Sequence, residues 1–580
     1  MAEPLLAKSY HNFIFPFIWQ NYKTEKERNF KSIMSIFNDN DAWEDDDLRD
    51  WHQIEVNDED VQPDGLNVNK LKYATYQYFQ PAIRDAMFGK GNEENKKEVV
   101  QNYSFRPIKT EEGQSTKQAK YIIRKHIRDD EKVYSLELTD IKLKLYNTGV
   151  GLLVFVCENR KNDNLADIKI INDYGRRITL PFIPDTSFAD GSVCADSIEI
   201  RWNGMSRYVG QNFKENIIRF NNADCNNERY NPKLNHIADF IKQILNYSTC
   251  SGTNTWQFTT NKDNKDKEKY WYIQPALDDR MFVMCAVHNN FQKVFRHYES
   301  CTPFDYINTL QSGILSEKNI KLYNYEKLEK SLYEFIFCDP PGGCSCSLER
   351  MRQQLIKEHL YLRWIDSVDG SLYTVAAQAF MCVTDADFLI NYFRTEYYEM
   401  VCLVLAQRAS LRVMQNKASS LSSDIEKDEN AVDREKRKQI ANLQEKLIAF
   451  QNQINLYEIS SQEQAIELYD MMRDVFLVNK HTSILQEQLD GLYNIANIHS
   501  NEHFNEMARN IAMAALVIAA PSFLSDFSGL KEEWFDNIGG HENILMIKFA
   551  IIFLVFVYFW GGFKFLKKQF QEIRGYISFE

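Results

Sequence analysis

The sequence lacks the short motifs that mark the common nucleotide-binding and hydrolytic sites. It contains no G-x-x-x-x-G-K-[ST], G-x-G-x-x-G, H-E-x-x-H or G-x-S-x-G pattern. Its scattered His, Asp and Glu residues form no spacing typical of a catalytic triad. The sequence gives no positive support for catalysis, and we therefore predict that the protein is not an enzyme.

The chain also lacks an excess of positive charge. Its 68 Lys and Arg residues are outnumbered by 81 Asp and Glu residues, which gives a formal net charge of −13. Nucleic-acid binders neutralise phosphates with clustered Lys and Arg. The charge balance thus argues against direct nucleic-acid binding, and it favours a surface that gathers cations.

Two further absences concern the cellular compartment. The 11 cysteines are scattered without a disulfide framework, which is typical of a reducing cytosol. The N-terminal segment has no basic region leading into an uninterrupted apolar core, so it is not predicted to be a secretory signal. Within it, His11–Phe17 is predicted to form a buried strand.

A chain of 580 residues predicts two or three folding units. Its mean hydropathy of −0.45 is polar, so any membrane part must be local. Residues Ile544–Phe563 are 20 residues with one charge, and about 20 apolar residues span a hydrocarbon core of roughly 30 Å. A weaker run of 16 uncharged residues lies between Arg509 and Asp526, for which a buried helix of a soluble protein is the alternative. Together the two runs predict a membrane hairpin.

Lysines set the predicted orientation of this hairpin. Lys564, Lys567 and Lys568 follow the second run, which places the C-terminus in the cytoplasm. Two spans then put the large N-terminal part there as well. The predicted localisation is the inner (cytoplasmic) membrane with both termini cytosolic, the lipid bilayer as a partner, and the acidic connecting loop facing outward.

A long helical pattern leads into the first run. Apolar residues from Leu468 to Leu492 recur at alternating spacings of three and four, and a second such seam extends from Ile440 to Tyr457. A helix from about residue 461 to about residue 525 is predicted. An earlier helix over Asp387–Asn416 is predicted to end at a Ser/Asp-rich turn, Ser419–Asp424. These seams predict a helical stalk.

The N-terminal part alternates strand-like and helical stretches. Leu165–Asn172, a turn at Asp173–Gly175, and Arg177–Ile183 are predicted to form a β-hairpin. The predicted fold class is a cytosolic α/β domain with a mixed sheet, a long α-helical stalk and two C-terminal transmembrane helices. The predicted boundaries are 1–380 for the cytosolic ligand-sensing domain, 381–504 for the stalk, 505–527 for the first span, 528–543 for the outward loop, 544–566 for the second span and 567–580 for the tail.

Two groups in this domain are candidate sites. Arg176 and Arg177 follow the predicted turn, where adjacent arginines can clamp phosphate or carboxylate, and a solvated surface loop is the alternative. Cys338, Cys344 and Cys346 surround a Pro-Pro-Gly-Gly segment. Their C-x5-C-x-C spacing is not a usual zinc spacing, so a tight loop with free thiols is favoured, and metal binding there stays open.

The C-terminal part of the sequence resembles the CorA family of magnesium channels. Asn505-Glu506-Met507, with Pro521 further along the same predicted helix, is similar to the Asn-Glu start and the proline of the family's pore helix. The resemblance covers residues 381–580. It implies a homo-oligomer, a pentamer, around a pore lined by the first span, with Mg²⁺ as the ion, and it makes Asn510, Ser525 and Asp526 the predicted pore-lining residues. The family's Gly-Met-Asn signature is missing, since only Gly529 of Gly529-Leu530-Lys531 remains. This departure puts magnesium selectivity in doubt.

Two N-terminal stretches, Ile171–Ile178 and His11–Phe17, look like the CorA-type effectors found beside type III CRISPR systems. This resemblance implies a cytosolic receptor for a nucleotide second messenger, S-adenosylmethionine–AMP, in antiviral defence. Arg176 and Arg177 are the residues expected to bind it. Three function classes follow: a messenger-gated membrane effector is favoured, a constitutive divalent-cation transporter is the alternative, and a membrane-anchored scaffold without a pore is the third.

Overall fold

The computed structural model describes sixteen segments of the chain, and the structural statements below concern these residues. They are 7–21, 30–37, 43–45, 74–89, 99–105, 119–127, 130–178, 194–202, 205–208, 238–245, 257–258, 271–278, 280–289, 322–364, 370–427 and 434–528. The chain divides into two compact units. Unit 1 comprises Met1–Ser419 with Leu443–Glu487, and unit 2 comprises Ser420–Asn442 with Gln488–Glu580.

Unit 1 is built on one mixed β-sheet, which has fourteen strands in the described part of the chain. Its main order is β12-β13-β14-β11-β1-β6-β5-β4-β7-β8. The pairing of β11 with β14 is parallel, and the other pairings are antiparallel. The strands are β1 Ser9–Asn21, β2 Trp43–Asp45, β3 Val100–Phe105, β4 Lys120–Ile127, β5 Asp130–Tyr146, β6 Val150–Asn159, β7 Ser197–Trp202, β8 Met205–Tyr208, β9 Gln257–Phe258, β10 Trp271–Pro275, β11 Phe282–His288, β12 Leu360–Arg363, β13 Ser371–Ala376 and β14 Ala379–Thr384.

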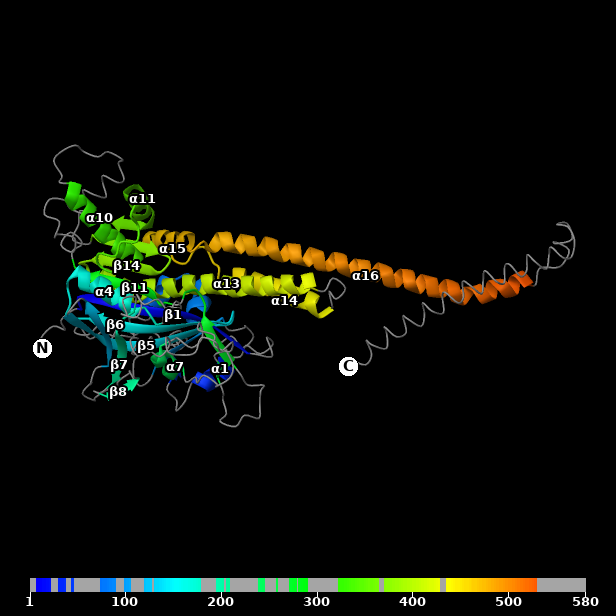
Figure 1. Cartoon of the computed structure of the whole chain (residues 1–580), viewed down its shortest axis with the longest axis horizontal. Coiled ribbons are helices and arrows are strands. Elements are labelled where there is room, and N and C mark those ends of the chain that lie inside the picture. Colours follow the sequence, from blue (N-terminus) through cyan, green and yellow to red (C-terminus); the bar gives the residue numbers. More distant parts are fainter. Residues whose placement is uncertain are drawn as a thin grey trace, which may run out of the picture. The chain divides into compact units, whose positions relative to one another are not determined.

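Helices cover both faces of this sheet (Figure 1). On one face, Phe30 of α1 packs on Trp19 of β1, and Phe240 of α7 packs on Phe155 of β6. On the other face, Tyr397 of α13 packs on Tyr373 of β13. The helices are α1 Phe30–Phe37, α3 Pro81–Phe88, α4 Leu165–Gly175, α7 Asp239–Ile244, α10 Leu322–Phe337, α11 Glu349–His359, α12 Asp387–Arg394, α13 Glu396–Lys427, α14 Arg434–Gln453, α15 Glu463–Val475 and α16 Val478–Ser528.

The central strand β1 is covered on both faces, and this explains why the sequence His11–Phe17 predicts a buried strand. Alternate side chains of a strand point to opposite faces, so a strand covered on both faces is apolar almost throughout. Phe13, Phe15 and Phe17 face the α1 and α4 side and are fully buried. Ile14 is buried as well, on the opposite face. The sequence prediction of a strand here, and of a mixed sheet with helices, agrees with the structure.

The predicted hairpin over Leu165–Ile183 is wrong in its first half. Residues Leu165–Gly175 form helix α4. Asn164 begins it, because its side-chain Oδ1 accepts a hydrogen bond from the backbone N–H of Ala166 at 3.0 Å. Its β-branched residues favoured a strand, but Ile168 and Ile171 lie three apart and are both fully buried on one helix face. Packing therefore overrode local propensity.

The predicted helices of the stalk differ from the structure at their ends. Helix α13 continues to Lys427, so the predicted turn at Ser419–Asp424 is helical. The predicted single helix from 461 to 525 is two helices, α15 and α16. Leu477 separates them with a positive φ of 56°, a conformation that ends a right-handed helix.

The predicted transmembrane class is also wrong. No helix within the described residues combines the length and the apolarity needed to cross a membrane. Helix α16 covers the predicted first span at 505–527 and is long, but its uncharged run of 16 residues is shorter than the roughly 20 that a span requires. The predicted second span at 544–566 lies outside the described residues. The predicted inner-membrane localisation, orientation and bilayer partner are withdrawn with this finding.

The contact between α4 and β1 yields a stability prediction at Gly175. A Cβ atom placed there would lie 2.6 Å from Cζ of Phe13 and 2.9 Å from Cδ1 of Ile123. Overpacking of a core typically costs about 1–3 kcal/mol. We expect Gly175→Ala to lower the free energy of unfolding by about this amount in urea denaturation followed by circular dichroism.

Helix α16 provides the matched control for this substitution. A Cβ at Gly491 meets no atom within 4 Å. Alanine is the better helix former, so Gly491→Ala is expected to be neutral or stabilising by about 0.5–1 kcal/mol. Equal losses in the two variants would contradict the packing assigned to Gly175.

Candidate functional site

The two arginines predicted to bind a ligand lie at the C-terminal end of α4. Their shared partner is Asp173, which is 1% exposed: Nη2 of Arg177 lies 2.8 Å from its Oδ1, and Nη2 of Arg176 lies 3.5 Å from the same atom. Arg176 is 2% exposed, and it also donates to the carbonyl of Cys338 at 3.3 Å and to Oε1 of Gln378 at 2.6 Å. Both arginines thus neutralise a buried carboxylate within the fold.

The two stretches that resemble the CRISPR-associated effectors meet in the core. Nδ1 of His11 lies 2.7 Å from Oδ1 of Asn172, and Nε2 of His11 lies 2.8 Å from Oγ of Ser9. Because the amide oxygen can only accept, Nδ1 carries the proton and Nε2 accepts from the serine hydroxyl. Asn159 donates to the same hydroxyl at 2.8 Å. These four side chains are at most 1% exposed, so we assign this network a structural role.

Burial lowers the pKa of His11 to about 4, and the hydrogen bond with Asn172 opposes this shift only in part. The ring is therefore neutral at pH 7. A neutral imidazole with both nitrogens hydrogen-bonded is a satisfied core residue.

The cysteine loop is held by hydrogen bonds of its own. The carboxylate of Glu334 accepts from the backbone N–H of Gly342 at 2.9 Å and from Nζ of Lys169 at 2.8 Å. Cys338, Cys344 and Cys346 are free cysteines, and burial raises the pKa of Cys338 to about 11. Within the described segments, no group of three or more His, Cys, Asp or Glu side chains is arranged to hold a metal ion.

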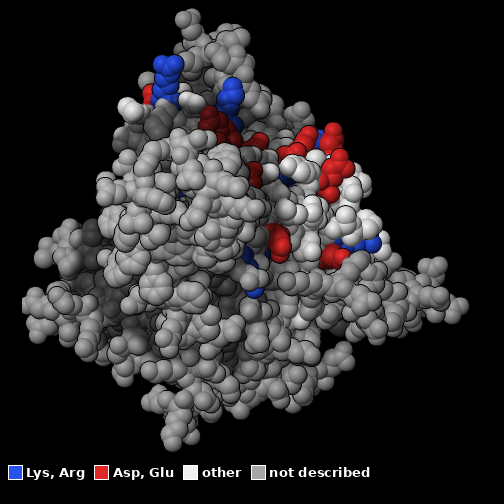
Figure 2. All heavy atoms as spheres, turned by 90° about the vertical axis from the view of Figure 1, so that its right-hand side faces the viewer, with Lys and Arg blue, Asp and Glu red and all other residues white. Residues whose placement is uncertain are grey.

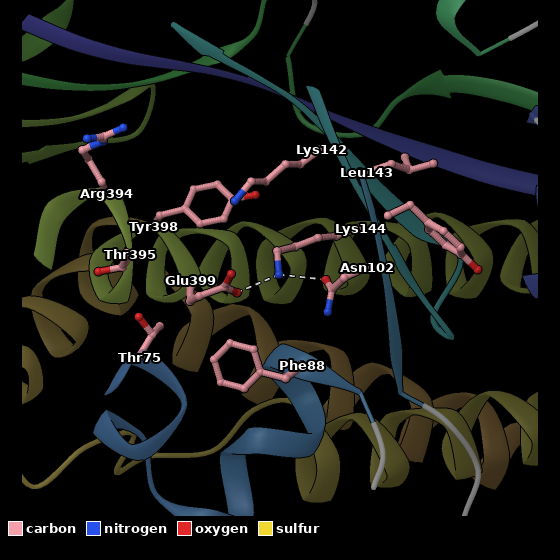
Figure 3. Close-up of a pocket in the computed structure, with 11 residues that line it drawn as sticks. Thr75, Phe88, Asn102, Lys142, Leu143, Lys144, Arg394, Thr395, Tyr398 and Glu399 are labelled. Carbon is pink, nitrogen blue, oxygen red and sulfur yellow. Dashed lines mark hydrogen bonds and ion pairs between the residues drawn. The ribbon is translucent and has the colours of Figure 1, made fainter. Parts of the chain in front are cut away.

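A pocket in unit 1 gathers basic side chains between the sheet and helix α13 (Figure 3), and we call it the cationic pocket. Its cavity volume is about 80 Å³, within an open hollow of about 560 Å³. It is lined by Thr75, Phe88, Asn102, Tyr103, Lys142, Leu143, Lys144, Arg394, Thr395, Tyr398 and Glu399. The enclosed part suits a small charged group, and the hollow accommodates a larger ligand.

The strand register brings the lysines of this pocket together. Lys142 and Lys144 are two residues apart on β5, so both point toward α13. Asn102 on β3 is the register partner of Lys144, and its Oδ1 accepts from Nζ at 2.8 Å. Nζ of Lys144 also forms an ion pair with Glu399 of α13 at 2.7 Å, and the two side chains are 4% and 12% exposed. This pair ties the strand to the helix.

Tyr398 lies between these charges. Nζ of Lys142 lies 4.9 Å from the centroid of its ring, and Nζ of Lys144 lies 5.8 Å from it, both within range of a cation–π interaction. Burial raises the pKa of the Tyr398 hydroxyl well above its ordinary value, so this group stays protonated and can donate a hydrogen bond. The lining thus carries two lysines against the one carboxylate of Glu399, while its third cation, Arg394, forms an ion pair with Glu158 at 2.8 Å.

The wider surface differs from this pocket. On the described part of the face in Figure 2, acidic and basic side chains lie next to one another. The formal net charge of −13 repels anions at a distance. An anionic ligand would therefore depend on a local concentration of cations such as the cationic pocket.

The predicted pore-lining residues lie far along the chain from this pocket. Asn510, Ser525 and Asp526 are all in α16. A pore-lining role requires a helix that spans a membrane, so this role is withdrawn with the transmembrane prediction.

Sequence reasoning missed the residues of the cationic pocket, although a signal was present. The alternation Lys142-Leu143-Lys144-Leu145 is typical of a strand and places two lysines on one face. From the sequence alone, a strand face with two lysines is interpreted as exposed to solvent. Its coverage by α13 depends on a contact between segments about 250 residues apart in the sequence, such as Lys144 with Glu399.

The described residues thus form a mixed α/β protein whose sheet is covered on both faces and which contains a pocket lined by basic side chains. The chain matches no family model, no curated protein and no solved structure. The resemblance to CorA-type proteins accordingly stays a prediction from short motifs.

Proposed function

We propose that this protein is a receptor for an anionic nucleotide messenger, which binds in the cationic pocket of unit 1. The observation that carries the proposal is the convergence of Lys142 and Lys144 on Tyr398, whose hydroxyl remains a donor. Charge-assisted hydrogen bonds from such groups are the usual means of holding phosphate. The candidate messenger is S-adenosylmethionine–AMP, and the setting is type III CRISPR defence, both taken from the sequence resemblance.

The proposed response to the ligand involves helix α13. An anion near Lys144 competes with Glu399, whose ion pair ties α13 to β5 at 2.7 Å. A ligand shifts a conformational equilibrium only by binding one state more tightly than the other. A state in which Glu399 has left Lys144 offers the ligand an additional cation, so messenger binding favours movement of α13.

Parts of the sequence prediction do not enter this proposal. The membrane effector, the divalent-cation transporter and the anchored scaffold all required membrane spans, and they are not carried forward. Mg²⁺ as an associated ion stays a prediction. The homo-oligomer and the absence of enzyme activity stay predictions.

The proposal predicts that Lys142 contributes directly to messenger affinity. Its loss removes one charge-assisted interaction, of about 1.5–3 kcal/mol, so Lys142→Ala is expected to raise the Kd for S-adenosylmethionine–AMP by about 10- to 100-fold. Isothermal titration calorimetry of the full chain measures this change.

Lys132 provides the control on the same strand. It is half-exposed, and its Nζ lies 3.4 Å from Asp167, outside the cationic pocket. Lys132→Ala is expected to leave the Kd unchanged. If the wild type and both variants bind with equal affinity, the messenger does not bind in the cationic pocket.

A further inference from the structure

A second pocket of unit 1 is surrounded by arginines, and we call it the arginine pocket. It has a cavity volume of about 100 Å³ within an open hollow of about 480 Å³. Its polar lining consists of Asp278, Arg280, Gln378 and Arg408. These residues come from the start of β11, the β13–β14 turn and helix α13, and none of them lines the cationic pocket.

Two arginines beside this pocket donate to backbone carbonyl groups. Arg408 and Arg412 are one helical turn apart on α13. Arg408 donates to the backbone carbonyl of Ala377 at 3.0 Å, and Arg412 donates to that of Leu277 at 2.7 Å. Neither forms an ion pair with a carboxylate of the described residues. Burial, together with the neighbouring charge of Arg412, lowers the pKa of Arg408.

The other charged residues of the pocket lining are Asp278 and Arg280, and Nη2 of Arg280 lies 3.1 Å from Oδ2 of Asp278. Arg408 of the lining is half-buried, and Arg412 lies exposed at the rim. A charge that is partly withdrawn from water, such as that of Arg408, is costly, and an anion of matching geometry relieves that cost.

Gln378 adds a neutral donor whose direction is fixed. Its Oε1 accepts from Nη1 of Arg176 at 2.6 Å, which leaves the amide N–H groups as donors at the pocket. Arg176 is itself anchored by the carbonyl of Cys338 at 3.3 Å. Arg176 is thus a positioning residue for Gln378.

We propose that the arginine pocket is a binding site for a phosphate group. Guanidinium groups present paired N–H donors that match the oxygens of phosphate, and Arg280 supplies them from the segment before β11 while Arg408 and Arg412 supply them from α13. The fixed amide of Gln378 supplies a further donor. This site is independent of the proposed messenger receptor, because the two pockets share no residue.

The probe is inorganic phosphate, added to the full chain as potassium phosphate and compared with potassium chloride at matched ionic strength. A ligand that binds the folded state raises the urea midpoint, and its concentration dependence gives a Kd. We expect phosphate to stabilise the wild type. In Arg408→Gln the phosphate Kd is expected to be at least about tenfold weaker, because a charge-assisted hydrogen bond is lost.

Lys142→Ala serves as the control, since inorganic phosphate can also enter the cationic pocket. The proposal predicts that this variant keeps the part of the phosphate stabilisation that Arg408→Gln loses. No stabilisation of the wild type, equal stabilisation of Arg408→Gln, or a loss confined to Lys142→Ala would each overturn it. If Arg408→Gln does not fold, the exposed Arg412→Gln takes its place with the same expected weakening.

Discussion

Replacing Lys144 by methionine is expected to lower the free energy of unfolding of unit 1 by about 3–5 kcal/mol. The substitution leaves the carboxylate of Glu399, which is 12% exposed, without its partner at 2.7 Å. It also removes the donor to Oδ1 of Asn102 at 2.8 Å. Removing one member of a buried ion pair costs much more than removing both, because the remaining charge stays in a medium of low dielectric. Urea denaturation of the full chain, followed by tryptophan fluorescence, measures the loss.

Two further variants distinguish this cause from a general loss of packing. Lys144→Met combined with Glu399→Leu removes both charges, so the double variant is expected to be more stable than Lys144→Met alone. Lys132→Ala removes a half-exposed partner of Asp167, for which less than about 1 kcal/mol is expected. A double variant less stable than Lys144→Met would show that the isolated charge is not the cause.

Acidification from pH 6.5 to pH 4 is expected to cost about 3 kcal/mol of unfolding free energy through His11 alone. The folded protein holds the pKa of this residue at about 4, against an ordinary value of 6.5. Between these two values the unfolded chain binds a proton that the folded protein does not, so stability falls as the pH falls. The stabilising contribution is complete above pH 6.5. A difference of about 2.5 units at about 1.36 kcal/mol per unit gives the magnitude.

The variant His11→Gln isolates this contribution from that of the carboxylates, which also titrate below pH 5. Glutamine keeps hydrogen-bonding groups near Ser9 and Asn172 but does not titrate. The difference in unfolding free energy between wild type and variant should therefore shrink by about 3 kcal/mol as the pH falls from 6.5 to 4. A difference that stays constant over this range would contradict a buried neutral imidazole.

Local patterns in the sequence predicted several elements of unit 1. The strand predicted at His11–Phe17 lies within β1. The helical pattern that begins at Leu468 lies first in α15. Each has a clear periodicity or a clear terminus of its own. The order of the strands had no such signal, because it depends on pairings between distant segments such as β1 with β11.

The errors have two physical origins. In Leu165–Gly175 the β-branched residues favour a strand. Burial of a helical face against β1 and β4 stabilises helix α4 instead. In α16 the seam of apolar residues was read as continuing into a membrane span, although its uncharged run is only 16 residues long. The arginine pair illustrates a third limit. Adjacent arginines predict an anion, and here that anion is Asp173 of the same helix.

The central claim is that the cationic pocket binds a nucleotide messenger. Isothermal titration of the purified full chain with S-adenosylmethionine–AMP tests it most directly, with S-adenosylmethionine and ATP as matched controls. The account predicts saturable heat with the conjugate and at least about tenfold weaker binding of either control, because neither offers the same set of groups. No heat with any of the three, or equal affinity for all three, would contradict it.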